Sequence, residues 1–342
     1  MGMDNKNIKR SNGIFYTEET PFKYKQVEEW LATIPEIYNR QVEMLEPFAG
    51  SNNLPRLFHE EFPNLKVNWA CFDKRRPEHN TYPKAEVLIQ DTIKDFPQGY
   101  KVCITNPPYL SKSSASRKKL DYPKDAKYDD LYKVCLDLIL ENCDYAGVII
   151  PESFITQGIF HDRIYSITSL NEKLFNDTEC PVCLVLFVPK SEDFKIYCGE
   201  EFLGYYSDLK EKVNKLLDAP ELSWKMNDKA GNISVICIDT QKKDTIHFQE
   251  GELISPDKIK ISSRSYTRLS GLPNDINRED FIKECNILMR EYRQITKDVF
   301  LTSFKGLRED GRYRRRLDFK TLKKIMNKAV ERIENREGFC KK

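Results

Sequence analysis

Six short apolar runs divide the first half of the chain. They read VEMLEPF, VNWACFD, AEVLIQD, KVCITNPP, AGVIIPES and CLVLFVP. Runs that are apolar almost throughout are typical of strands buried on both faces of a parallel sheet. The clearest helical segment between them is DDLYKVCLDLILENC, where Asp129 and Asp130 are candidate caps. Strands alternating with helices predict an α/β fold with a mostly parallel, doubly wound sheet.

The pattern changes after Ser191 toward alternating, more polar segments such as NISVICIDTQ and TIHFQEGELI. Long charged helices are predicted from about residue 277. We therefore expect two domains, an α/β domain over residues 1–195 and an α+β domain over residues 196–342.

Charge and cysteine content narrow the class of protein only slightly. With 55 Lys+Arg against 53 Asp+Glu, the net charge is +2, which does not indicate a particular class of binding partner. The ten cysteines lie mostly inside apolar runs, which fits buried thiols in a reducing compartment. Cys180 and Cys183 have no second pair at zinc spacing, so we expect a strand there and no metal. The N-terminus has no apolar signal core, and no run reaches the roughly 20 residues that cross a bilayer, so a cytoplasmic location without membrane contact is expected.

The fourth apolar run ends on Asn106-Pro107-Pro108-Tyr109. Proline has no N–H to donate to a sheet, so the strand is expected to stop at Asn106. Earlier strand ends also carry chemistry: a small-residue turn follows Glu46, and acidic residues close the next two strands at Asp73 and Asp91. In doubly wound sheets, ligands bind outside the carboxyl ends of the strands. Each acidic residue alone is more often a turn residue than a ligand.

Together these segments resemble a known family. NPPY is similar to motif IV of amino-methyltransferases, EPFAGSNN to their motif I and GIFYT to their motif X. Their order, with a C-terminal extension, resembles the gamma class of DNA adenine-N6 methyltransferases, over roughly residues 12 to 190. The resemblance implies a Rossmann-like class I methyltransferase sheet, S-adenosyl-L-methionine as cofactor, and a C-terminal target-recognition domain.

The resemblance also assigns roles to individual positions. Residues implied to line the cofactor pocket are Phe15, Tyr16, Thr17, Glu46, Phe48, Gly50, Asp73, Asp91 and Asn106. The family usually has a second glycine where this chain has Asn52. Asparagine tolerates positive φ better than other non-glycine residues, so the turn is expected to survive.

The residues Asn106, Pro107, Pro108 and Tyr109 are the candidate catalytic group. An adenine amino group is a poor nucleophile because its lone pair is delocalised into the ring. The Asn106 side-chain oxygen and the Pro107 carbonyl could each accept one N6 hydrogen, while the prolines hold both acceptors still. Tyr109 offers a face for a base flipped out of the duplex. The segment LFNDTECPVCLVLF is similar to motif VIII of the gamma class, which makes Phe175 a second stacking candidate; a core phenylalanine is an equal alternative.

Basic residues cluster near the C-terminus and suit phosphate or guanine contacts. A solvated helical face is the alternative interpretation. The candidate DNA-contacting residues are Arg264, Arg268, Lys305, Arg312, Arg314, Arg315 and Arg316.

The sequence and this resemblance therefore predict a site-specific adenine-N6 methyltransferase acting on double-stranded DNA. The resemblance alone implies a cognate restriction endonuclease as a functional partner. A cytosine-C5 enzyme would need a Pro-Cys nucleophile, and CPVC has the opposite order. Cytosine N4 stays open, although those enzymes more often have serine at the Asn106 position. Two further alternatives are an NPPY enzyme acting on RNA guanine N2 or a protein glutamine, and a degenerate DNA-binding module without cofactor affinity.

Overall fold

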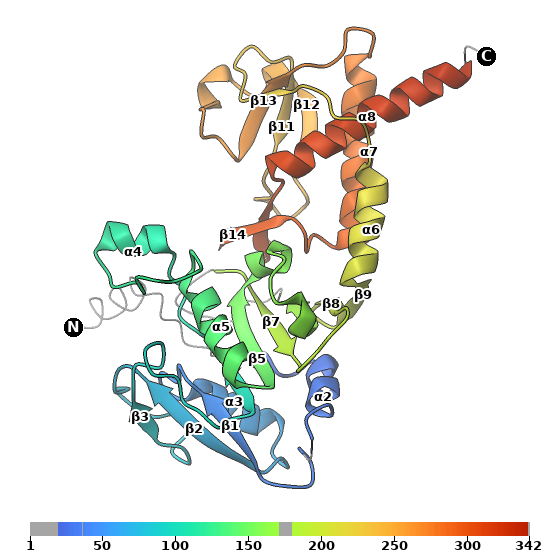
Figure 1. Cartoon of the computed structure of the whole chain (residues 1–342). Helices are drawn as coiled ribbons and strands as arrows, with labels where there is room; N and C mark the ends of the chain where they lie inside the picture. Colours follow the sequence, from blue (N-terminus) through green and yellow to red (C-terminus); the bar gives the residue numbers. More distant parts are fainter. Residues whose placement is uncertain (1–19, 36, 171–179, 341–342) are drawn as a thin grey trace. The chain divides into compact units, whose positions relative to one another are not determined.

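The computed structural model describes residues 20–35, 37–170 and 180–340 (Figure 1). The chain divides into two compact units, residues 1–202 and residues 203–342. The domain boundary expected after residue 195 falls at the start of a strand, Lys195–Cys198, that belongs to the sheet of the first unit. Unit 1 therefore continues past residue 195.

Unit 1 is built on a nine-stranded sheet of order β3-β2-β1-β4-β5-β7-β6-β8-β9. Its strands are β1 (Val42–Glu46), β2 (Val67–Asp73), β3 (Val87–Ile89), β4 (Val102–Thr105), β5 (Tyr145–Pro151), β6 (Ile164–Ser169), β7 (Val182–Phe187), β8 (Lys195–Cys198) and β9 (Glu201–Tyr205). Strands β1 to β5 are mutually parallel, whereas β7 runs antiparallel to both of its neighbours, β5 and β6. The predicted mixed α/β fold with a mostly parallel sheet is confirmed. Each of the six apolar runs contains a strand.

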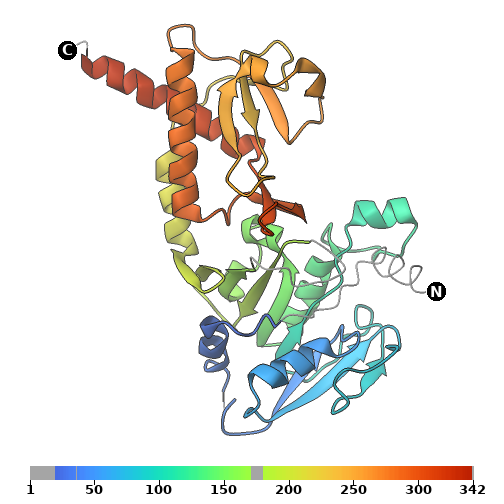
Figure 2. The same ribbon diagram turned by 180° about the vertical axis from the view of Figure 1, so that it is seen from behind.

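Helices cover both faces of this sheet. The α-helices of unit 1 are α2 (Lys25–Leu31), α3 (Asn53–Glu61), α4 (Lys112–Lys118) and α5 (Leu131–Asn142), and its 3-10 turns are η1 (Glu152–Thr156) and η2 (His161–Arg163). Helices α2 and α3 share one core with the strands, centred on Trp30 and Phe58. Figure 1 shows α5 in front of the sheet, and Figure 2 shows α3 in front when the view is reversed. The sheet is thus a buried central layer, as its apolar strands require.

Helix α5 begins as expected, but its capping differs from the sequence prediction. Asp130 is the N-cap residue, and its side chain accepts no capping hydrogen bond. Instead, Asp129 and Asp130 both pair with Lys133 in the first turn, at 2.8 and 3.6 Å. Lys133 is largely buried, so the two carboxylates compensate its charge and do not cap the backbone N–H groups at the start of the helix.

Unit 2 combines helices with antiparallel strands. Its strands form a four-stranded sheet of order β10-β13-β11-β12 and a separate β14-β15 hairpin. The elements of unit 2 are α6 (Tyr206–Leu217), β10 (Lys225–Met226), β11 (Ile233–Ile236), β12 (His247–Glu250), η3 (Gly251–Leu253), η4 (Pro256–Lys258), β13 (Tyr266–Ser270), α7 (Arg278–Thr296), β14 (Thr302–Leu307), β15 (Tyr313–Arg316) and α8 (Phe319–Cys340).

Two side-chain contacts fasten the helices of unit 2 to its strands and loops. Asn286 of α7 exchanges two 2.9 Å hydrogen bonds with the backbone of Phe248, at the outer edge of β12. The Trp224 indole donates to Asn327 of α8 at 2.7 Å and stacks on Phe281 of α7. Helix α7 therefore packs directly against the small sheet, and Trp224 joins α7 to α8, which gives unit 2 an α+β core of its own.

Candidate active site and nucleic-acid interface

Four chemically distinctive residues lie at one edge of the sheet in unit 1. Glu46 ends β1 and Asp73 ends β2, while Asp91 and Asn106 follow β3 and β4. These strands are neighbours and parallel in the order β3-β2-β1-β4. The carboxyl ends of parallel strands share one edge, so the fold brings the four predicted residues to the same side of the sheet.

The turn after β1 adopts the left-handed backbone that the sequence predicted. Gly50 has φ of 51° and Asn52 has φ of 62°, which confirms that Asn52 takes the positive φ of the usual glycine. The Asn52 amide nitrogen donates to Asn80 Oδ1 at 3.1 Å and to the Ala85 carbonyl at 2.9 Å. Both bonds fix the side chain in the interior, where Asn52 is fully buried. Asparagine therefore replaces glycine here with a compensating set of contacts.

Asp73 ties this turn to the neighbouring strand. The Gly50 N–H donates to Asp73 Oδ2 at 2.9 Å, and the Arg75 N–H donates to Oδ1 at 2.8 Å. Each carboxylate oxygen accepts one of these bonds and has a further lone pair, so Asp73 can also accept hydrogen bonds from ligand hydroxyl groups. Asp91 is 24% exposed and pairs with Lys74 at 3.0 Å. Its unused lone pairs suit an exocyclic amine.

Glu46 is the most perturbed acid of this group. Burial raises the pKa of Glu46 to about 8, against the lowering effect of hydrogen bonds from Thr105 and from the Phe48 N–H. Those donors lie 2.5 and 3.0 Å from Glu46 Oε1. A nearby cation would stabilise the ionised form of this buried carboxyl and lower its raised pKa. The sequence did not single out Thr105, which ends β4 directly before Asn106.

The NPPY segment leaves the sheet as predicted. Strand β4 ends at Thr105, and Pro107 is buried. The Tyr109 hydroxyl lies 2.5 Å from Asn106 Oδ1 and 2.8 Å from the Ile149 carbonyl. It has a single proton and so donates to one of these oxygens at a time. The sequence placed Tyr109 in the candidate catalytic group as a stacking surface, and in the structure its hydroxyl also contacts the candidate catalytic amide.

Phe48 sits between the β1 turn and the helices that follow β4. It packs against an apolar cluster made by Leu110, Ala115, Leu131 and Cys135. The cluster connects the turn with α4 and α5. The other predicted residues of the N-terminal motif, Phe15, Tyr16 and Thr17, and the predicted stacking residue Phe175 lie outside the described residues.

The donor and acceptor set fits a nucleoside-type cofactor with a positive charge. The turn with two left-handed residues lets backbone approach a ligand closely. Asp73 and Asp91 supply acceptors for hydroxyl and amine groups, and the buried Glu46 carboxyl suits a cation. S-adenosyl-L-methionine has all of these features. Glu46, Gly50, Asp73 and Asp91 are the described residues that would hold it.

The predicted DNA-contacting residues in unit 2 differ in their surroundings. Arg264 is exposed, with its guanidinium 5.2 Å from the centre of the Phe319 ring. Arg268 instead donates through Nε and Nη2 to the Gly231 carbonyl at 2.9 and 2.8 Å. A guanidinium held in this way braces the loop beside β13. The Arg264 side chain is thus exposed to solvent, whereas the Arg268 guanidinium is hydrogen-bonded to the Gly231 backbone carbonyl.

The β14-β15 hairpin holds the other predicted residues. Arg312 is exposed at the turn, and Arg314 is half-buried, donating to the Leu307 carbonyl at 3.1 Å. Arg315 is 7% exposed, and Arg316 is half-buried. Lys305 lies in β14, and its side chain is outside the described part of the chain. Alternate residues of β15 therefore face the interior, which separates Arg314 and Arg316 from Arg315.

A buried ion-pair cluster anchors the loop of this hairpin. Arg308 lies 3.1 Å from Asp244 and 3.0 Å from Asp310, and Arg293 of α7 lies 2.8 Å from the fully buried Asp239. Asp239, Asp244 and Asp298 are close enough to hold a cation. Arg293 contacts all three and Arg308 contacts Asp239 and Asp244, so most of the negative charge of this cluster is offset within the protein. Within the described ranges, no helix is long and apolar enough to span a membrane.

Comparison with known proteins gives a family match over part of the chain. Residues 14–180 match the family described as Eco57I restriction-modification methylase. No curated protein matches the chain.

Several solved structures are similar to part of the chain at low identity. A class I S-adenosylmethionine-dependent methyltransferase from Listeria monocytogenes, described as putative, is 13% identical, with a TM-score of 0.37, over 50% of this chain and 63% of that one. A type I restriction-modification methyltransferase subunit from Streptococcus thermophilus is 15% identical, with a TM-score of 0.40, over 53% and 47%. A modification subunit of a type I restriction enzyme, also described as putative, from Vibrio vulnificus is 15% identical, with a TM-score of 0.35, over 54% and 47%. The match covers 63%, 47% and 47% of the lengths of these three structures, which is less than two thirds in each case.

The strand-end residues and the family match lead to the same identification. The turn after β1, the acids after β2 and β3 and the NPPY segment after β4 all fall inside the matched residues. Residues 14–180 are therefore similar to the Eco57I restriction-modification methylase family, and the strand-end donors and acceptors fit S-adenosyl-L-methionine as the methyl donor.

Proposed function

We propose that this chain methylates the N6 amino group of adenine in double-stranded DNA, at a specific site and on a flipped base. The observation that carries the proposal is the position of Asn106. Its side-chain oxygen is contacted by Tyr109 at 2.5 Å, immediately after the strand that also holds Glu46 through Thr105. Bound S-adenosylmethionine supplies an activated methyl group on a sulfonium.

The role of Asn106 is to accept hydrogen bonds from the target amine. The amide oxygen has two lone pairs, and Tyr109 can use one of them. The second accepts one N6 hydrogen, and the Pro107 carbonyl accepts the other. Both bonds draw electron density onto nitrogen and aim its lone pair away from the protein oxygens. Proline rigidity keeps the acceptors in place, because φ of Pro107 and Pro108 is fixed.

Tyr109 has two tasks in this proposal. Its hydroxyl orients the Asn106 amide, and its half-buried ring offers a surface against which a flipped adenine can stack. The ring also makes a T-shaped contact with Tyr132, with centroids 6.4 Å apart. A base must leave the duplex before its amino group can reach such a site. The same chemistry would operate on cytosine N4, so the base must be identified by experiment.

Unit 2 is proposed to recognise the DNA sequence. Its exposed or half-buried arginines, Arg264, Arg312, Arg314 and Arg316, can reach phosphates or guanine edges. We extend the proposal to Lys305 and to the more enclosed Arg268 and Arg315, whose guanidinium groups would contact DNA only after rearrangement. The family match supports a role in a restriction-modification system, with protection of sites that a cognate endonuclease would cut.

The test is methyl transfer from labelled S-adenosylmethionine. Wild-type protein is incubated separately with unmethylated plasmid DNA and with total RNA, and digested products are separated by mass spectrometry. We expect label in DNA as N6-methyladenine. Label in RNA guanine, in protein or in cytosine would contradict the proposal.

The catalytic role of Asn106 is tested in the same assay. Asn106→Ala removes the amide oxygen and is expected to abolish transfer, while calorimetry still detects cofactor binding. Asn142→Ala, at the end of α5, is a matched control that should retain activity. Retained transfer by Asn106→Ala would overturn the mechanism, and absence of cofactor binding in the wild type would indicate a degenerate domain.

A further inference from the structure

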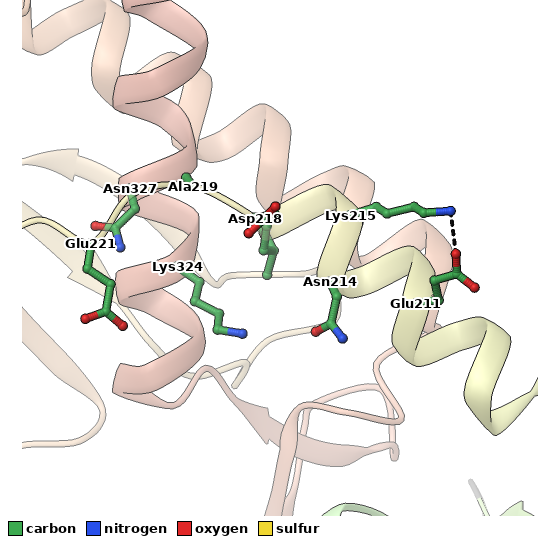
Figure 3. Close-up of a pocket in the computed structure, with 9 residues that line it drawn as sticks. Glu211, Asn214, Lys215, Asp218, Ala219, Glu221, Lys324 and Asn327 are labelled. Carbon is green, nitrogen blue, oxygen red and sulfur yellow. Dashed lines mark ion pairs between the residues drawn. The ribbon is translucent and has the colours of Figure 1, made fainter.

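Three lysines of unit 2 are near enough to repel one another, and one of them, Lys324, lines a surface pocket. Lys210 belongs to α6, while Lys320 and Lys324 lie one turn apart on α8. The pocket has a volume of about 450 Å³. Figure 3 shows Lys324 of α8 and Asn214 of α6 among the side chains that line it. Asn214 is four residues after Lys210, so both lie on the same face of α6.

Lys210 is held in place by aromatic rings. Its ammonium lies 5.2 Å from the centre of the Phe300 ring and 5.9 Å from that of Tyr206. These two rings pack edge to face, with centroids 5.9 Å apart. Cation–π contact of this kind fixes the direction of a long side chain without neutralising its charge. Lys210 is therefore an oriented cation rather than a freely rotating one.

The charges of the three lysines are uncompensated. In the part of the chain that the structure describes, no carboxylate lies within 4 Å of the ammonium groups of Lys210, Lys320 or Lys324. Other lysines of the same helices are paired: Lys215 lies 2.5 Å from Glu211, and Lys328 contacts Glu331. Partial burial lowers the pKa of Lys210, and the positive charges of Lys324 and Lys320 lower it further. The protein alone thus contains mutual repulsion that an anion would relieve.

Acidic residues limit the extent of this positive surface. Glu211, Asp218 and Glu221 line the same pocket as Lys324. Glu211 is occupied by Lys215, so its charge is compensated. Asp218 and Glu221 would repel an anion from their own side of the pocket. The favourable location for an anion is therefore the side where Lys324 approaches Lys210 and Lys320.

We propose that Lys210, Lys320 and Lys324 form a binding site for phosphate groups of the DNA backbone. This site is separate from the arginines of the hairpin and rests on the proposed action on DNA. Phosphodiester oxygens accept hydrogen bonds from ammonium groups, and Asn214 can add an amide donor. Such contacts hold the duplex without reading its sequence, so they serve register and affinity rather than base choice.

The test compares salt dependence of DNA binding. The triple variant Lys210→Gln, Lys320→Gln, Lys324→Gln removes three charges from the site. The control Lys25→Gln, Lys215→Gln, Lys225→Gln removes the same charge from exposed lysines that are each paired with a carboxylate. The probe is a fluorescein-labelled random-sequence duplex of about 30 base pairs, followed by anisotropy in KCl from about 50 to 200 mM, the range over which phosphate contacts dominate salt dependence.

Each phosphate contact contributes about 0.9 to the slope of log K against log salt. We expect the slope of the site variant to fall by about 2 to 3 units, with affinity at least about tenfold lower at low salt. The control should keep the wild-type slope within about 1 unit, because paired surface lysines make few phosphate contacts. Equal slopes for the site variant and the control would overturn the site.

Two further measurements accompany the salt titration. The melting temperature tests whether the lysines have only a structural role, and methyl transfer by the wild type tests the proposed function independently of the phosphate site. The melting temperature of the site variant should change little, because loss of the Lys210 cation–π contacts offsets the relief of repulsion, whereas a structural role for the lysines would lower it clearly. Methyl transfer by the wild type to DNA, with an unchanged slope in the site variant, overturns the phosphate site alone. Absence of any DNA binding by the wild type overturns both proposals.

Discussion

The hydroxyl of Tyr109 lies 2.5 Å from the side-chain oxygen of Asn106, three residues earlier in the same rigid segment. The two prolines between them fix the backbone, and the hydroxyl can donate to the oxygen that we assign to the target amine. The Tyr109 hydroxyl donates its proton to the amide oxygen of Asn106 and not to the NH₂ group, which is itself a donor. This hydrogen bond therefore selects which end of the Asn106 amide faces the ligand. Tyr109 is thus a positioning residue as well as a stacking surface.

Tyr109→Phe separates these two roles. Phenylalanine keeps the ring but loses the hydroxyl, so base stacking is preserved while the Asn106 amide loses an orienting bond. A single hydrogen bond of this kind contributes about 0.5–1.5 kcal/mol, which corresponds to a roughly 2- to 10-fold lower kcat. Steady-state methyl transfer would show the loss in kcat, with KM for DNA almost unchanged.

Tyr122→Phe provides the matched control for that measurement. Tyr122 also donates its hydroxyl to a backbone carbonyl, that of Tyr128, but it does not contact Asn106. Its variant should retain wild-type kcat. An equal loss in both variants would mean that the effect of Tyr109→Phe is general destabilisation rather than amide positioning.

The raised pKa of Glu46 gives unit 1 a characteristic pH dependence. Burial raises the pKa of this carboxyl from 4.5 to about 8 on folding, so the folded protein retains a proton that the unfolded chain loses. The corresponding stability is complete below pH 4.5 and is lost as the pH rises to about 8. Glu46→Gln cannot titrate, and its free energy of unfolding should vary less over this window in urea titrations at several pH values.

Cofactor binding should respond to the same group. A cationic ligand favours ionised Glu46, so wild-type affinity is expected to increase toward pH 8 with release of a proton, measurable by calorimetry in buffers of different ionisation enthalpy. Glu43→Gln, on the same strand but exposed, should behave like the wild type. A flat pH profile for the wild type would refute the assignment of Glu46 to the cation.

Asn52 has a left-handed backbone and Asn53 a helical one, so alanine and glycine substitutions should affect stability in opposite order at these two positions. Asn52→Ala and Asn52→Gly both lose the bonds to Asn80 and Ala85, but only alanine is strained at φ of 62°. The alanine variant should therefore be less stable by about 1 kcal/mol. At Asn53, which begins α3, the order should reverse because glycine disfavours helix. Denaturant unfolding of the four variants measures both differences, and the same order at both positions would contradict the assigned turn.

The sequence predicted the strands that are apolar throughout and missed one whose interior is polar. Strand β6 reads IYSITS, yet Ser166, Thr168 and Ser169 are fully buried. Two of these hydroxyls are used by distant residues: Ser169 donates to Glu152, and Thr168 accepts from Gln26 at 2.9 Å. A hydroxyl-rich strand is indistinguishable from a loop in sequence when its partners are far along the chain.

The candidate site shows the same limit. NPPY and the acidic strand ends are local signals, and the structure brings them to one edge of the sheet. The contact between Thr105 and Glu46 joins residues from different strands and has no local signature. Similarly, Arg268 looks like a free cation in sequence, but its guanidinium is held by the remote Gly231 carbonyl. Chain-distant contacts such as these determine which charges remain available for DNA.

Methyl transfer to adenine N6 of DNA through the Asn106 amide, as we propose it, leaves a direct mark in the DNA of a cell. The most direct measurement is to express the wild type and Asn106→Ala in a methylation-deficient host and to sequence the modified bases in its DNA. We expect N6-methyladenine at one recurring sequence with the wild type and none with Asn106→Ala. Unmodified adenine in the wild-type host, or equal modification by both proteins, would contradict it.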